Sequence, residues 1–210
     1  MIRKNSLFIK LLKIKTSSNF LFESYMAKFM PELETCPFCN SSNNCSVHAY
    51  YDRYLTDFCN GHQSSSCVRI LRVVCSSCNH THAVLPDIII PYRTYTLFFI
   101  LRVLAEHFRA LSSVENICDR FEISIGTFYQ WLKLWHEHKA EWLGLLSDLE
   151  YSDYDFLKFI LRGDRFSDFL MLFYKKAAIS FMQSHCNPHP PSIKTALYRQ
   201  EVFSPDYDIF

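Results

Sequence analysis

Two cysteine pairs with the spacing C-x2-C constrain the fold of this chain more than any other feature. The first is CPFC, from Cys36 to Cys39, and the second is CSSC, from Cys75 to Cys78. A tight turn within such a pair lets both sulfurs reach one ion about 2.3 Å away, and two pairs supply the four ligands of a tetrahedral site. Zinc fits four thiolates best. Because no coordination position stays open to water, we expect a structural site.

The distribution of cysteines favours metal binding over disulfides. Seven of the nine cysteines fall between Cys36 and Cys78, and the odd total argues against complete pairing. The apolar N-terminal stretch is interrupted by Lys10, Lys13 and Lys15, whereas a signal peptide needs an unbroken apolar run. We therefore expect a cytoplasmic protein, in whose reducing surroundings clustered cysteines are more often metal ligands.

Composition excludes several classes of protein. The 210 residues are 49% hydrophobic and 20% charged, which is typical of a globular chain that can bury a core. The longest apolar runs, LFFIL and FLMLFY, are far shorter than the roughly 18 residues that a membrane span requires. The net charge of +1 provides no strong field to attract nucleic acid, so any DNA contact must be local.

Changes in sequence texture predict four segments: a basic N-terminal lead (1–34), a zinc ribbon (35–91), a helix-turn-helix domain (92–146) and a helical tail with an irregular C-terminus (147–210). The lead could contact phosphate or be a solvated or frayed terminus. Met26 or Met30 is an alternative start. The expected class is α+β, with a small antiparallel zinc-ribbon sheet followed by a mainly helical domain that contains the helix-turn-helix.

The predicted ribbon contains three short strands, VHAYYDRYL, CVRILRVV and THAVL. An irregular loop around Asn60-Gly61 is expected between the first two. The two C-x2-C pairs, called knuckles from here on, lie further apart along the chain than the roughly 15 to 20 residues of the common zinc pattern. The alternative to a metal site is a set of free cysteines buried as small hydrophobic side chains.

The insert between the knuckles offers a second set of ligand types, and a second zinc there is a weaker hypothesis. His48 or His80 could also replace one ligand of the main site. His80 and His82 are interpreted as polar strand or turn residues. The residues of the second set are Cys45, His48, Cys59 and His62.

Helical periodicity begins after Pro91. Leu97, Ile100, Leu101, Leu104 and Phe108 recur at helical spacing.

A second helix is expected to begin near Ser112, which forms a capping-box pattern with Glu115. A third follows Ser124 and has the apolar stripe Phe128, Trp131, Leu132 and Trp135. The tail is expected to hold helices at about 153–162 and 166–183.

The second and third helices fit a helix-turn-helix, in which the second helix of the pair lies in the DNA major groove. Glu122 occupies the turn, where Gly is usual. A plain helical bundle, with Trp131 and Trp135 in its core, is the alternative. The residues expected at the DNA surface are Ser124, Ile125, Gly126, Thr127, Tyr129, Gln130 and Lys133.

The succession of CPFC, RILRVVCSSCNHTHAVLPDIIIPYRTY and the helix pair resembles a bacterial family of unknown function related to insertion-sequence transposases. The resemblance spans about residues 36–140. It implies a zinc ribbon followed by a helix-turn-helix, like the DNA-recognition part of a transposase. It also implies zinc ligation by Cys36, Cys39, Cys75 and Cys78, and a recognition helix beginning at Ile125.

The sequence therefore predicts a zinc-dependent DNA-binding module or regulator of a mobile element, acting with DNA and with a second copy or a transposition protein. The alternative is a zinc-ribbon adaptor that binds protein. We expect no enzymatic activity, because the candidate carboxylates for a two-metal site are interpreted as a solvated helix face. They are Asp153, Asp155, Asp164 and Asp168.

Overall fold

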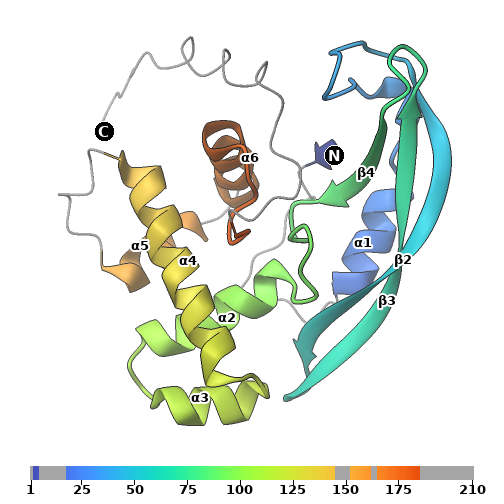
Figure 1. The fold of residues 1–210 in the computed structure, drawn as a ribbon. Coiled ribbons are helices and arrows are strands. Elements are labelled where there is room, and N and C mark those ends of the chain that lie inside the picture. The colour runs from blue at the N-terminus through green and yellow to red at the C-terminus, as the bar shows by residue number, and fades with distance from the viewer. Residues whose placement is uncertain (1, 5–17, 145–151, 162–164, 185–210) are drawn as a thin grey trace.

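The computed structural model describes residues 2–4, 18–144, 152–161 and 165–184 (Figure 1). It is an α+β structure in which a curved β-hairpin lies on one side of a group of helices. The elements, in chain order, are β1 (Ile2–Lys4), α1 (Ser18–Met26), η2 (Pro31–Leu33), β2 (Cys45–Cys59), β3 (His62–Cys75), β4 (Thr81–Pro86), α2 (Leu97–Phe108), α3 (Val114–Phe121), α4 (Ile125–Leu143), α5 (Asp153–Ile160) and α6 (Arg165–Ala177).

The sheet has the strand order β1-β4-β3-β2. β3 is antiparallel to both β2 and β4, as expected for a small antiparallel sheet, and β1 adds to β4 in parallel. The pairing of β4 with β3 is confined to the last part of β3, from Arg72↔Ala83 to Val74↔Thr81. The three-stranded part of the sheet therefore lies next to the second cysteine pair.

The expectation of short strands and an irregular loop in the insert is wrong. β2 and β3 form one hairpin with continuous register from Cys45↔Cys75 to Cys59↔His62, apart from a shift between Val47 and Ala49. Its turn is Asn60-Gly61, with φ of 54° and 88°. Asn-Gly is the strongest two-residue hairpin signal, because both residues tolerate positive φ and the resulting turn matches the strand twist.

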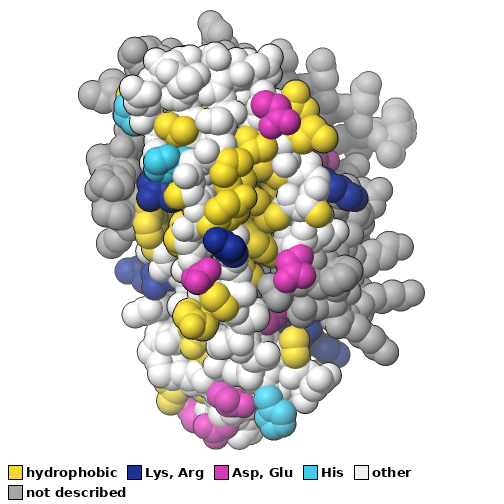
Figure 2. Space-filling model, turned by 90° about the vertical axis from the view of Figure 1, so that its right-hand side faces the viewer, with side chains coloured by type: hydrophobic (Ala, Val, Ile, Leu, Met, Phe, Trp, Pro, Cys, Tyr) yellow, Lys and Arg dark blue, Asp and Glu magenta, His cyan; other side chains and the backbone are white. Residues whose placement is uncertain are grey.

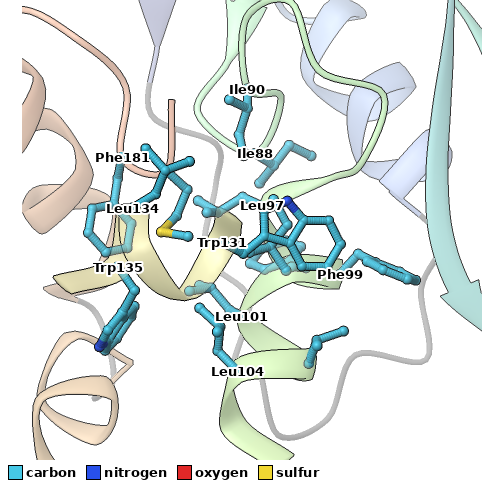
Figure 3. Close-up of a cluster of buried hydrophobic side chains, with 14 of the residues drawn as sticks. Ile88, Ile90, Leu97, Phe99, Leu101, Leu104, Trp131, Leu134, Trp135 and Phe181 are labelled. Atoms are coloured by element: carbon cyan, nitrogen blue, oxygen red, sulfur yellow. The ribbon is translucent and has the colours of Figure 1, made fainter. Parts of the chain in front are cut away.

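One buried cluster joins the sheet to the helices. It contains Phe22 of α1, Leu55 of the hairpin, Leu97 of α2 and Phe156 of α5, and so includes residues from all four predicted segments. The segment boundaries themselves stay a prediction. In Figure 3, side chains of α2 and α4 meet beside the residue 88–90 loop and Phe181. The expected apolar stripe of α2 is confirmed. Its members Leu97, Ile100, Leu101 and Leu104 are buried, and Phe108 packs against the cluster.

Helices α3 and α4 are joined by a tight turn of three residues. Ser124 caps α4 as expected, accepting a hydrogen bond from Thr127 N at 3.1 Å. The predicted cap of α3 is one residue off, since Ser113 rather than Ser112 accepts from Asn116 N. Glu122 adopts the left-handed conformation at φ 53°, and Ile123 N donates to Cys118 O at 3.0 Å. This is a helix-ending motif that glycine usually occupies.

The tip of the hairpin holds this turn. Gln63 Nε2 donates to Phe121 O at 2.9 Å and to Glu122 O at 2.8 Å. These carbonyls lie where α3 ends and lack partners within the helix. Both protons of one amide group are therefore used to fix the segment that leads into α4, and they offset part of the roughly 1 to 2 kcal/mol that a left-handed non-glycine residue costs.

The two tail helices are confirmed, although α6 ends at Ala177, earlier than expected. Asp153 is not on a solvated face: it accepts hydrogen bonds from Trp135 Nε1 and Lys139 Nζ, both at 2.9 Å, and so ties α5 to α4. Burial raises the pKa of Asp153, but these hydrogen bonds leave it below its usual value. Asp155 and Asp168 are both exposed, as a solvated helix face requires, and Asp164 lies outside the described residues.

Among the described helices, none has the length and apolar character needed to cross a membrane.

Gln63→Ala should lower the free energy of unfolding by about 1 kcal/mol, since two carbonyls lose their donor. Gln63→Glu should cost more, because it sets a carboxylate oxygen against both carbonyls. Chemical denaturation followed by circular dichroism measures both changes, with the exposed neighbour Ser64→Ala as control. Equal stability of Gln63→Glu and the parent chain would contradict the assigned contacts.

Candidate metal centre

The four predicted cysteine ligands meet in one place. The sulfurs of Cys36, Cys39, Cys75 and Cys78 all lie within 4.8 Å of one another. The Cys36–Cys78 and Cys39–Cys75 sulfur pairs are each 3.7 Å apart. Four sulfurs at tetrahedral corners about 2.3 Å from one ion would be about 3.8 Å apart. The four side chains could therefore hold one metal ion.

The two knuckles share one backbone geometry. In each, the asparagine after the second cysteine has φ of 58°. Asn40 N donates to Cys36 O at 2.9 Å, and Asn79 N donates to Cys75 O at 2.8 Å. Asparagine tolerates the left-handed conformation better than most residues. The Cys-x2-Cys-Asn repeat thus explains how both turns bring their sulfurs together.

Contacts between the knuckles hold them face to face. The hydroxyl oxygens of Ser41 and Ser77 are 3.0 Å apart, and Ser76 N donates to Asn44 O at 2.8 Å. The rings of Phe38 and His80 stack with centroids 3.6 Å apart. The site is therefore built by the segment before β2 and the segment after β3, next to the end of the hairpin that is uppermost in Figure 1.

The thiols differ in environment. Cys36 and Cys75 are fully buried, Cys78 is half-buried and Cys39 is exposed. Burial raises the pKa of Cys75, but the backbone N–H groups of Ser77 and Cys78 and two neighbouring thiols lower it to about 6. The His80 N–H lowers the pKa of Cys78, but burial and the other three thiols raise it to about 12. Without a cation, the cluster cannot readily ionise all its thiols.

His82 also reaches the cluster, and the interpretation of this residue as an ordinary polar strand residue missed it. Its Nε2 lies 3.3 Å from Cys36 Sγ, and the side chain is 7% exposed. Burial lowers the pKa of His82 to about 4, so the ring is neutral at pH 7. His80 instead directs Nδ1 to Cys78 O at 3.0 Å. Both histidines follow the second knuckle within four residues, so the sequence alone does not distinguish their roles; the fold does.

The second ligand set is divided between the two ends of the hairpin. Cys45 pairs with Cys75 at one end, whereas Cys59 pairs with His62 at the other. A strand of 15 residues spans roughly 45 Å at about 3.3 Å per residue. Those four residues therefore cannot share one ion. Within the described part of the chain, the four knuckle cysteines form the one group of three or more ligand types close enough to do so.

The residues predicted at a DNA surface lie at the other end of the hairpin, on the first turns of α4 (Figure 1). Ile125 and Tyr129 are 48% and 53% exposed, and Gly126, Gln130 and Lys133 are also exposed. Thr127 is half-buried, with its hydroxyl 2.9 Å from that of Ser124. Lys133 Nζ is 3.8 Å from Glu137 Oε1. These side chains form a continuous accessible helix face.

Comparison with known protein families gives a match over part of the chain. A family described as a domain of unknown function (DUF6431) matches residues 36–131, which begin at Cys36 of the cluster and end within α4. No curated protein and no solved structure matches the chain. The matched span includes the four cysteines, the hairpin and the turn before α4.

We expect one metal ion per chain, lost in Cys75→Ser and Cys78→Ser together with the fold of the sheet, because metal binding supplies folding energy in small sites of this kind. Cys67→Ser is the matched control, since Cys67 is an exposed cysteine on β3 outside the cluster. Elemental analysis and circular dichroism of purified protein measure both effects. A fully folded chain without metal would contradict the site, and two ions per chain would contradict a single centre built from these four cysteines.

Proposed function

We propose that the protein is a zinc-dependent DNA-binding module in which the metal centre stabilises the sheet and α4 contacts DNA. The observation that carries this proposal is the accessible face at the start of α4, directly after a capped tight turn from α3. That arrangement matches a helix-turn-helix, whose second helix places its N-terminal residues in the major groove.

Zinc is the ion that suits the donor set. Four thiolates in tetrahedral arrangement favour zinc among the common cellular ions, and calcium or magnesium would require oxygen ligands. Because the four sulfurs complete the coordination, we assign the ion a structural role. Free thiols in such a cluster fit a reducing compartment, so we propose a cytoplasmic location.

The face of α4 combines groups that suit base reading and phosphate contact. Gln130 can pair with adenine through two hydrogen bonds, and Lys133 can reach phosphate. The N–H groups of Ile125 and Gly126, which precede the capped Thr127 N–H, favour a phosphate at the start of α4 as well. With one lysine on this face and a net charge of only +1, the salt dependence should be modest. Two copies on a symmetric site, or a transposition protein, would extend the contact.

Gln130→Ala should reduce discrimination between the preferred and altered DNA sites by about 1 to 3 kcal/mol. Lys133→Ala should weaken binding to all sequences alike and lower the salt slope by about one. Lys158→Ala is the charge-matched control, because Lys158 is an exposed residue of α5 paired with Asp155. Fluorescence titrations at several salt concentrations measure these effects. Unchanged binding in both α4 variants would favour the helical bundle.

An adaptor that binds protein is the second candidate, favoured by the outer face of the hairpin. Figure 2 shows hydrophobic side chains gathered in a band along this face, with basic and acidic groups beside it. Tyr50 and Tyr54 are 50% and 65% exposed on β2, and the Arg69 guanidinium lies 4.9 Å from the Tyr50 ring centre. Protein binding that is insensitive to both salt and DNA would support this candidate over the first.

We further propose that the chain recognises DNA without cutting it. Strand transfer by two metal ions needs carboxylates held so that the cations lie about 3.5 to 4 Å apart. The described tail residues, 152–161 and 165–184, form the helices α5 and α6 without a strand, and Asp153 is occupied by Trp135 and Lys139. This chain therefore fits the recognition part of a transposase better than its catalytic core.

Incubation of the protein with Mg²⁺ or Mn²⁺ and a candidate element end should give a complex but no cleaved or joined product. Gel analysis of labelled DNA measures this. Cleavage that disappears in Asp168→Asn but persists in Asp155→Asn would overturn the proposal.

A further inference from the structure

The buried contact between His82 and Cys36 carries an inference beyond the assignment of four cysteine ligands. His82 is the second residue of β4 and pairs in register with Val73 of β3. The strand therefore fixes its backbone next to the metal centre. Its Nε2 is 3.3 Å from Cys36 Sγ, which is within hydrogen-bond range for a sulfur acceptor. Both side chains are buried, so water does not compete strongly for this contact.

The negative charge of the metal-loaded centre would make a hydrogen bond to the Cys36 sulfur stabilising. Four thiolates and one divalent cation carry a net charge of minus two, and half of the ligands are fully buried. Buried charge is costly unless hydrogen bonds compensate it. Cys75 receives such help from the backbone N–H groups of Ser77 and Cys78. At the equivalent cysteine of the first knuckle, Phe38 N donates to Cys36 Sγ at 3.5 Å, and His82 would give Cys36 a second donor, as Cys75 has.

We propose that His82, with its proton on Nε2, donates a hydrogen bond to the Cys36 thiolate in the metal-loaded protein and so acts as a positioning residue of the centre. The bond holds the Cys36 sulfur in place and withdraws part of its charge. Partners of metal ligands that act in this way typically change affinity by about 10- to 100-fold. The inference rests on the metal centre of the proposed function and does not depend on DNA binding.

The sharpest probe is Co²⁺, whose absorption bands report the sulfur ligands, added to the full reduced chain. His82→Phe keeps a ring of similar shape but removes the donor, and it should lower Co²⁺ affinity at least about tenfold in competition with a chromophoric chelator. The sulfur-to-cobalt charge-transfer band should move to lower energy, because a thiolate without its hydrogen bond gives up an electron more easily. His82→Gln, which restores an N–H donor, should recover part of both effects.

His62→Phe is the matched control, because His62 is an exposed histidine at the far end of the hairpin from the four cysteines. It should leave both the band and the affinity nearly unchanged. Unaltered affinity and an unmoved band in His82→Phe would overturn the proposal. So would a visible spectrum of mixed nitrogen and sulfur ligation in the parent chain that His82→Phe abolishes, since His82 would then be a ligand itself.

A measurement on the unchanged chain covers the case in which His82→Phe fails to fold. In protein loaded with a spin-half cadmium isotope and carrying nitrogen-labelled histidine, the Nε2 proton of His82 should show a scalar coupling to the metal through the sulfur. A His82 ring protonated at Nδ1 alone, seen in the same spectra, would contradict the proposal. If the cysteines bound no metal at all, the proposed centre would fail first, and the elemental analysis would show it separately.

Discussion

Charge repulsion among four clustered cysteine sulfurs, once they ionise to thiolates, is the constraint on which the closed end of the sheet depends. Their sulfurs lie within 4.8 Å of one another, and the pKa values of Cys75 and Cys78 are driven apart to about 6 and about 12. A bound divalent cation eases this conflict, because it offsets half of the charge of four thiolates. The same cation would join the segment before β2 to the turn between β3 and β4, and so close the three-stranded part of the sheet around a small buried cluster.

The β2–β3 hairpin connects this centre to the helix pair. An isolated two-stranded hairpin is marginally stable, and here its two ends are held by different means. At one end, Cys75 of β3 lies in the four-cysteine cluster, and a bound ion would hold it there. At the other end, Gln63 donates hydrogen bonds to the carbonyls of the α3–α4 turn. Phe58 packs against Phe121 with ring centres 4.6 Å apart, which adds an apolar contact beside Gln63. Loss of the ion should therefore weaken the support of α4 as well as the sheet.

Local chemistry made much of this structure predictable. The knuckle spacing gave the four cysteines, and periodicity with Ser124 gave α2 and α4. The Asn60-Gly61 turn carried a readable hairpin signal that was misinterpreted, and the asparagine after each knuckle offered a similar signal for the left-handed turns. Gln63, His82 and Asp153 could not be predicted, because each acts on a partner that only strand register or helix packing brings near. Whether α4 reads DNA stays a prediction.

X-ray absorption at the zinc edge of the purified protein tests the central claim most directly, because the scattering shell identifies the ligand atoms around the ion. The structure predicts four sulfur neighbours at about 2.3 Å and no nitrogen or oxygen in the first shell. Histidine or water in that shell, or a folded protein that contains no zinc to measure, would contradict a closed centre built from Cys36, Cys39, Cys75 and Cys78.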